Sequence, residues 1–139
     1  MRKKLNKIAL EFISDLKYTE FCVLVASYIR NMINIKEDEF FKIEISLREV
    51  LNNAIIHGNK ADKTKRICVT FWWTRFRFYM SIKDENREKV DFEVINKKLR
   101  NNDILSSSGR GILIMKSYMD KVEFRPSLNG TEVILEKKL

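Results

Sequence analysis

The sequence predicts an α+β fold, a two-layer α/β sandwich in which helices cover one face of a mostly antiparallel mixed sheet. Three observations predict it. Stretches with an apolar residue at every second position lie before and after stretches of helical spacing. With 139 residues, of which 45% are hydrophobic, the chain is long enough to bury one core. No linker, repeat or low-complexity tract divides it, so we expect a single domain over residues 1–139.

The first half of the chain is predicted to form one strand and two helices. Residues 8–12 alternate as an edge strand does, and from about residue 18 to residue 33 the spacing becomes helical. Asn34, with Glu37 three residues later, is typical of a capping arrangement at a helix N-terminus. We therefore expect a second helix that ends at Gly58-Asn59, where the glycine provides a C-terminal stop.

The second half is predicted to consist mostly of strands. Residues 67–73 and 76–82 alternate on either side of a short connection, which predicts an antiparallel hairpin. Residues 85–108 are polar and are interpreted as a mobile loop or lid, with a helix over 90–99. The remaining expected elements are a helix after Gly111, a strand over 121–125, a turn over 126–130 and a last strand over 131–137.

The charge and the apolar stretches limit the functional classes. The net charge is +8, from 27 Lys and Arg against 19 Asp and Glu, and the basic residues are scattered along the chain. A solvated surface, or an acidic partner or ligand, explains this charge, whereas nucleic-acid binding is supported by charge alone and is not expected. The apolar stretch 21–29 is far shorter than the ~20 residues of a membrane-spanning helix, and no signal peptide is indicated. We expect a cytoplasmic protein without a membrane segment.

The cysteines and the histidine do not indicate a metal site. Cys22 and Cys68 lie in apolar runs without CxxC spacing, which predicts two reduced thiols in the core. With one His and no Cys cluster, a dedicated zinc site is not expected.

The four glycines of the chain fall in three short segments, at Gly58, at Gly109 and Gly111, and at Gly130. A chain so poor in glycine is expected to use it where a side chain cannot be tolerated. Together with polar residues near these segments, the glycines indicate a nucleotide-phosphate site assembled from distant pieces of one domain.

The polar residues suit such a site chemically. Glu49 and Asn53 are four residues apart and share one face of the second helix, and His57 continues that row. An amide oxygen is a hard ligand for Mg²⁺, and a carboxylate can accept a proton from a hydroxyl. Alone, this spacing is more typical of a solvated helix face. Asp84, after a strand, could accept a hydrogen bond from an exocyclic amine such as that of adenine, although an isolated aspartate there is more often a turn residue.

The Gly-Arg-Gly segment at 109–111 precedes an expected helix, whose free backbone N–H groups would suit phosphate oxygens. There is no Walker A sequence, which excludes a P-loop NTPase.

In this order and spacing, the motifs resemble the N, G1, G2 and G3 boxes of the GHKL ATPases, the superfamily of the histidine-kinase catalytic domains. The segments EVLNNAIIHGN (49–59) and SSGRGILIMKSYMDKVEF (107–124) look like the branch of anti-sigma-factor serine kinases from bacterial partner-switching systems. The resemblance covers nearly the whole chain. It implies a Bergerat-type ATP-binding fold with ATP and Mg²⁺ as cofactors.

The resemblance also implies roles for individual residues. Glu49 would be the general base that accepts the proton of the substrate serine, and Asn53 would coordinate Mg²⁺ between the ATP phosphates. Asp84 would bind the adenine amine, and Thr131 would support Asp84 or a water beside the base. The other implied ATP-binding residues are His57, Gly58, Asn86, Gly109, Arg110 and Gly111. Such proteins bind a sigma factor, phosphorylate a STAS-type anti-anti-sigma protein and form homodimers.

The chain departs from the family pattern in the G1 box. The usual Asp-x-Gly-x-Gly reads here Asp84-Glu85-Asn86-Arg87-Glu88. If Asn86 takes the place of the first glycine, we expect it to adopt a left-handed backbone with its side chain beside the adenine. The retained Glu49 and Asn53 favour a kinase. Asn86 favours the alternative, a catalytically degenerate regulator of the same fold that binds protein partners without effective ATP use.

Overall fold

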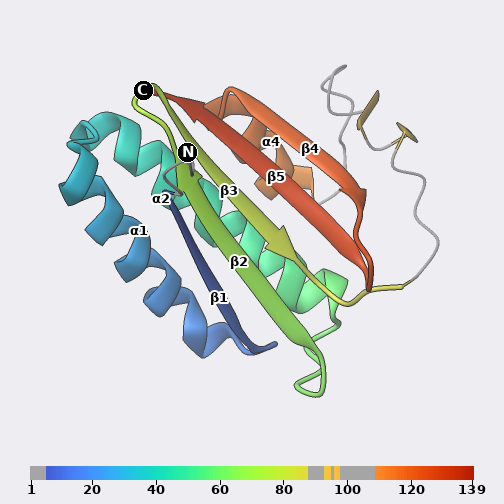
Figure 1. Ribbon diagram of the computed structural model, residues 1–139. Coiled ribbons are helices and arrows are strands. Elements are labelled where there is room, and N and C mark those ends of the chain that lie inside the picture. Colours follow the sequence, from blue (N-terminus) through green and yellow to red (C-terminus); the bar gives the residue numbers. More distant parts are fainter. Residues whose placement is uncertain (1–5, 88–92, 95, 98–108) are drawn as a thin grey trace, which may run out of the picture.

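The computed structural model describes residues 6–87, 93–94, 96–97 and 109–139, and shows one sheet with helices on one face (Figure 1). The elements in chain order are β1 (Lys7–Ile13), η1 (Leu16–Tyr18), α1 (Thr19–Ile33), α2 (Glu37–Asn52), η2 (Asn53–Gly58), β2 (Arg66–Trp73), β3 (Arg77–Lys83), α4 (Gly109–Tyr118), β4 (Lys121–Pro126) and β5 (Thr131–Lys138). The predicted two-layer α+β class is confirmed.

The sheet has the strand order β1-β2-β3-β5-β4, and β1 is an edge strand as predicted. Every pairing among these strands is antiparallel, and β2 and β3 form the expected hairpin. Val69 of β2 lies opposite Leu10 of β1 and Ile82 of β3, so these three apolar residues point to the same face.

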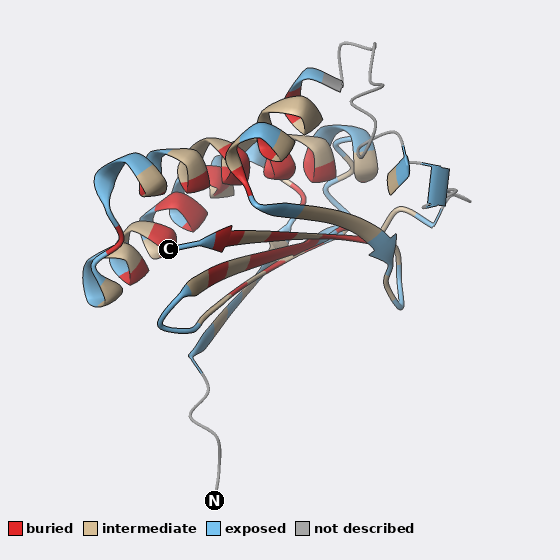
Figure 2. Ribbon diagram, turned by 90° about the horizontal axis from the view of Figure 1, so that it is seen from above, coloured by how far each residue is buried: buried red, intermediate tan, exposed pale blue. Residues whose placement is uncertain are grey.

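The core fills the space between the sheet and the helices (Figure 2). Its fully buried members include Val69, Phe71, Phe78, Met80 and Leu135 from the sheet and Ile29, Ile43, Leu47, Val50 and Met115 from the helices. Each large apolar side chain buried in this way contributes about 1.5–3 kcal/mol of transfer free energy. The core residues of α2 pack this helix against the sheet. This packing fixes the positions of the polar residues on the opposite side of α2.

Several local predictions differ from the structure. Asn34 does not cap α2; it ends α1 in a left-handed conformation (φ 57°), with its N–H donating to the carbonyl of Arg30. A short amide side chain tolerates this conformation better than most others, which explains why Asn stands here. The helical run ends at Gly58 as predicted, but Gly58 is not left-handed; Lys60 and Ala61, just beyond it, are. Helix α4 begins at Gly109, three residues earlier than expected.

Two further predictions have mixed outcomes. Cys22 is buried, and burial raises the pKa of its thiol to about 12, but Cys68 is only half-buried, so one of the two thiols lies in the core. The predicted lid and most of the predicted helix over 90–99 lie outside the described residues. Among the described helices, none is both long and apolar enough to cross a membrane.

Candidate functional site

The first part of the candidate site lies where α2 meets the N-terminal turn of α4. Gly111, in that turn, is buried, and a Cβ at this position would lie 2.5 Å from Oε2 of Glu49 and 3.5 Å from its Cδ. The missing side chain therefore lets the half-buried carboxylate of Glu49 approach the α4 backbone. The first four N–H groups of a helix have no partner within the helix, and they carry the positive end of its dipole. Glu49 thus lies beside a place that favours anionic groups.

Asn53 lies one turn after Glu49, as the spacing predicts. It is half-buried, and its backbone N–H donates to the carbonyls of Glu49 and Val50. From Asn53 to Gly58 the helix widens into a π-helical turn, η2, which the sequence analysis did not predict. Such turns are rare and occur frequently at functional sites. Because the wider turn breaks the four-residue repeat, His57 does not continue a regular α-helical row, and its side chain is exposed.

The second part of the site surrounds Asp84, which follows β3 and is 8% exposed. Its Oδ1 accepts hydrogen bonds from the N–H groups of Asn86 (2.9 Å) and Thr131 (3.2 Å). Its own N–H donates to the carbonyl of Thr131 at 2.9 Å. The structure therefore brings Thr131 to Asp84, as expected, through the backbone of Thr131.

Two glycines enclose Asp84 from different sides. A Cβ on Gly58 would lie 2.8 Å from the Asp84 Cγ and nearer still to Oδ2, whereas carbon atoms in ordinary contact are 3.5–4.0 Å apart. A Cβ on Gly130 would lie 2.8 Å from both the carbonyl carbon of Asp84 and the nitrogen of Asn86. Gly58 therefore makes room for the Asp84 carboxylate, and Gly130 makes room for the Asp84 backbone.

Burial raises the pKa of Asp84, and the hydrogen bonds from Asn86 and Thr131 and the charge of Lys65 lower it by less. Water solvates this carboxylate poorly, so a hydrogen-bond donor that reaches Oδ2 in this environment interacts more strongly than it would in water. Asp84 is therefore suited to recognising a donor group of a ligand.

The prediction of a left-handed backbone at Asn86 is wrong. Among the described residues, positive φ angles occur at Asn34, Lys60 and Ala61 and not at Asn86. The N–H of Asn86 instead turns back to the side chain of Asp84, two residues earlier, in the manner of an Asx turn, which residues other than glycine adopt easily. Glu88, the other departure from the G1 pattern, lies outside the described residues.

The two parts of the site both lie along the C-terminal half of the helical run formed by α2 and η2. Gly58 comes nine residues after Glu49, which corresponds to roughly 13 Å along an α-helical axis. Gly109 and Arg110 belong to the same first turn of α4 as Gly111, and Arg110 is exposed. The helical run thus approaches Asp84 at Gly58 and the first turn of α4 at Glu49.

Among the described residues there is no group of three or more His, Cys, Asp or Glu side chains that could hold a metal ion. Mg²⁺ is usually held by one or two protein oxygens together with phosphates and water. The amide of Asn53, one turn from Glu49, suits that role only if a ligand supplies the phosphate oxygens.

Asn59 is a buried polar residue of the site that the sequence analysis treated only as part of a helix stop. It is 0% exposed, and its side chain bonds to the backbone of Arg66, seven residues later, and of Glu85, 26 residues later. A polar residue after a glycine is the only local signal, and such a signal is common at helix ends.

The chain is similar to known proteins over nearly its whole length. The family model of the histidine kinase-like ATPase domain matches residues 15–137. An anti-sigma F factor of Bacillus subtilis (strain 168) is 31% identical over 137 residues, which cover 96% of this chain and 93% of that protein. Proteins of the same name are 26% identical in Clostridium perfringens (strain SM101 / Type A), over 96% of this chain and 97% of that protein, and 28% identical in Geobacillus stearothermophilus, over 95% and 92%.

Proposed function

Since the chain belongs to the histidine kinase-like ATPase domain family, we propose that it is an anti-sigma factor and an ATP-dependent protein serine kinase of a bacterial partner-switching system. The observation that carries the proposal is the arrangement of α2. This helix places Glu49 against the first turn of α4 and, through η2, places Gly58 against the side chain of Asp84.

The structure supports a position for ATP along this helical run. Asp84 Oδ2, on the side of Gly58, would accept a hydrogen bond from the adenine amine. The free N–H groups at the start of α4, with Arg110, would receive the phosphates. Asn53 lies on the same side and would coordinate Mg²⁺ between those phosphates. The remaining residues that we assign to the ATP site are His57, Asn86, Gly109, Gly111 and Thr131.

In the proposed reaction, a serine hydroxyl of a STAS-type anti-anti-sigma protein attacks the γ-phosphorus of ATP. Glu49 accepts the hydroxyl proton while the new O–P bond forms. The bond between the γ-phosphorus and the bridging oxygen breaks, and ADP leaves with that electron pair. Catalysis of this kind depends on positioning and charge neutralisation, which the N-terminus of α4 and the amide of Asn53 would provide.

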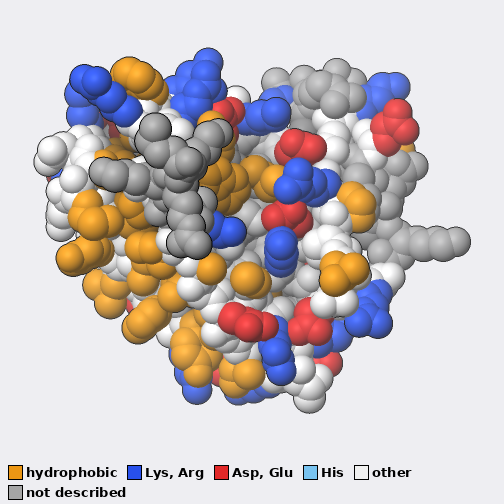
Figure 3. All heavy atoms as spheres, in the orientation of Figure 1, with side chains coloured by type: hydrophobic (Ala, Val, Ile, Leu, Met, Phe, Trp, Pro, Cys, Tyr) orange, Lys and Arg blue, Asp and Glu red, His pale blue; other side chains and the backbone are white. Residues whose placement is uncertain are grey.

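An apolar stripe on α1 supports binding to a protein partner. Phe21, Leu24, Tyr28 and Met32 follow one another at helical spacing and are 57%, 67%, 67% and 48% exposed. Figure 3 shows hydrophobic side chains gathered over α1. Contiguous exposed apolar surface marks protein contacts. Because the relatives are named anti-sigma F factors, we assign this stripe to a sigma factor of that kind and propose a homodimer for the protein itself.

The test of the kinase is Glu49→Gln, assayed with Mg·ATP and a serine-bearing STAS protein. The amide keeps the shape of the side chain but cannot accept the proton, so we expect phosphoryl transfer to fall at least ~100-fold. Binding of a fluorescent ATP analogue should be largely unchanged. Transfer at the parental rate would remove Glu49 from the role of general base.

A specific observation also favours the alternative, a regulator without effective ATP use. Oδ1 of Asp84 is already engaged by the N–H groups of Asn86 and Thr131, and Asn86 replaces a glycine of the family pattern. Titration of the protein with the fluorescent ATP analogue and Mg²⁺ separates the two functions. A kinase binds the analogue and transfers phosphate, whereas the regulator inhibits its sigma factor equally well with and without nucleotide.

A further inference from the structure

The buried side chain of Asn59 joins three segments of the chain. Its Nδ2 donates to the carbonyl of Arg66, at the start of β2, over 3.0 Å. Its Oδ1 accepts from the N–H of Glu85, after β3, over 2.8 Å. Its own backbone N–H donates to the carbonyl of Ala54 in η2 over 2.8 Å. One amide group therefore connects the end of the α2 run to two strands.

Asn59 and Glu85, which share a hydrogen bond, are the sequence neighbours of Gly58 and Asp84, which face each other in the site. Asn59 directly follows Gly58, and Glu85 directly follows Asp84. The hydrogen bond from Glu85 to Asn59 therefore fixes the Asp84 segment against the Gly58 segment, 26 residues away along the chain. Asp84 Oδ1 is held by other backbone groups, so Oδ2 remains on the side of Gly58.

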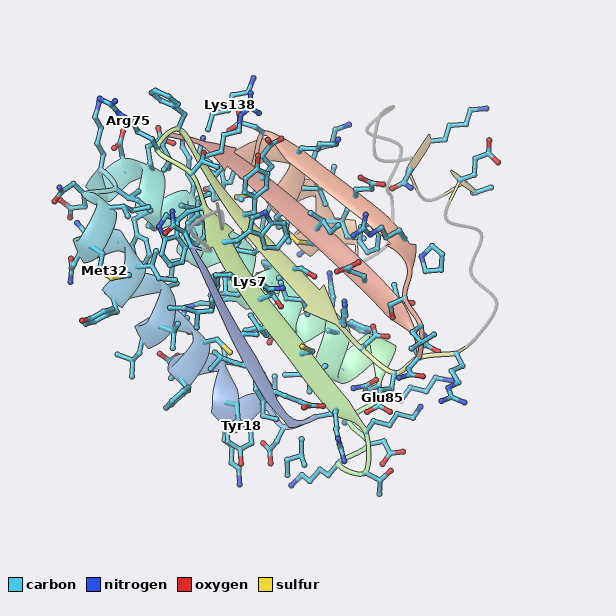
Figure 4. The ribbon with its side chains drawn as sticks, in the orientation of Figure 1. Lys7, Tyr18, Met32, Arg75, Glu85 and Lys138 are labelled. Carbon is cyan, nitrogen blue, oxygen red and sulfur yellow. The ribbon has the colours of Figure 1, made fainter. Side chains whose placement is uncertain are left out.

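A second bond strengthens this connection. The N–H of Arg66 donates to Oε1 of Glu85 over 2.5 Å, so Arg66 and Glu85 are linked to each other as well as to Asn59. Glu85 lies at the lower end of the sheet, where the segment after β3 passes the start of β2 (Figure 4). The three linked residues leave the carboxylate of Asp84 little freedom to move away from Gly58.

On the basis of the proposed ATP binding, we propose that Asn59 is a positioning residue that sets the separation of Asp84 from Gly58 and thereby selects purine nucleotides with an amino group, rather than a keto group, at the six position of the ring. An amine donates a hydrogen bond to Oδ2 of an ionised Asp84. A keto oxygen at the same place is itself an acceptor, so it repels the carboxylate oxygen. This discrimination requires a carboxylate that cannot turn aside. If the bond from Glu85 to Asn59 is lost, Asp84 can shift to relieve the repulsion, and the selectivity falls.

The experiment measures the dissociation constants of Mg·ATP and Mg·GTP, by displacement of a fluorescent ATP analogue, for the full chain and two matched variants. Asn59→Leu has nearly the same size and makes neither hydrogen bond. Asn59→Asp keeps an acceptor for the N–H of Glu85, but it loses the donor to Arg66 and buries a carboxyl group. We expect both variants to unfold at a lower temperature than the parent. We expect only Asn59→Leu to lower the preference for ATP over GTP, by about tenfold or more.

A purely structural role would move the unfolding temperature but not the ratio of the two dissociation constants. Unchanged ratios in all three proteins therefore overturn the inference and leave the proposed ATP binding intact. A parent protein that binds neither nucleotide overturns the proposed function, and this inference with it. If Asn59→Leu does not fold, Asn59→Ser replaces it, because its hydroxyl is too short to bridge both segments and is expected to lower the ratio in the same way.

Discussion

Gly58→Ala is the substitution that tests the packing around Asp84 most directly. The added Cβ would lie 2.8 Å from Asp84 Cγ, so the carboxylate would have to move by roughly 0.7–1.2 Å to reach an ordinary contact distance. Asp84 cannot move this far without weakening its hydrogen bonds from Asn86 and Thr131, which are 2.9 Å and 3.2 Å long.

The expected magnitude is a balance of two terms. A hydrogen bond to a charged group contributes about 1.5–3 kcal/mol, and alanine gains about 1 kcal/mol over glycine within a helix. The loss of one bond therefore leaves a net decrease of about 0.5–2 kcal/mol in the free energy of unfolding. Because Asp84 is also the proposed acceptor for adenine, we expect ATP affinity to fall about tenfold, which corresponds to about 1.4 kcal/mol.

Urea unfolding and competition with a fluorescent ATP analogue measure the two effects. Gly111→Ala is the matched control for the urea measurement alone, because its added Cβ comes closest to the end of the Glu49 side chain, which can rotate away. We expect the control to be at least as stable as the parent. A Gly58→Ala protein whose free energy of unfolding rises by about 1 kcal/mol and that binds ATP normally would refute this account. The substitution would then have no effect beyond the higher helix propensity of alanine.

Three further substitutions test other parts of the site. Asn53→Ala should weaken ATP binding only with Mg²⁺ present; an equal loss in EDTA would mean that Asn53 has a structural role. Asn86→Gly should lower the free energy of unfolding by about 0.4–1 kcal/mol in urea denaturation without tightening ATP binding, because Asn86 has no left-handed strain to relieve. In Asp84→Asn, thermal unfolding should show a stability advantage over the parent that grows as the pH rises above about 4, the ordinary pKa of an aspartate, and through the raised pKa of Asp84 in the folded protein. Burial raises the pKa of Asp84, so the folded parent loses stability as this carboxyl ionises, and the amide does not ionise. An advantage that is independent of pH would contradict this.

The periodicity of the sequence determined the fold class, the edge strand, the β2–β3 hairpin and the two long helices, because these depend on which side chains alternate toward one core. The scarcity of glycine correctly indicated close approaches of the backbone. A Cβ at Gly58 or Gly130 would collide with Asp84, whereas one at Gly111 would meet the movable end of the Glu49 side chain.

Only the tertiary structure decided what holds these residues in place. The π-helical turn at Asn53–Gly58, the ordinary backbone of Asn86 and the buried bonds of Asn59 leave no periodic pattern in the sequence. Asn34 carried a local signal for a helix start and was used for a helix end, because both uses rely on the same short amide. The physical reason is the range of the interactions. Periodicity reflects which face of a helix or strand packs on the core. The hydrogen bonds of Asn59 with Glu85 and of Asp84 with Thr131 instead join residues 26 and 47 positions apart, which meet only once the sheet has formed.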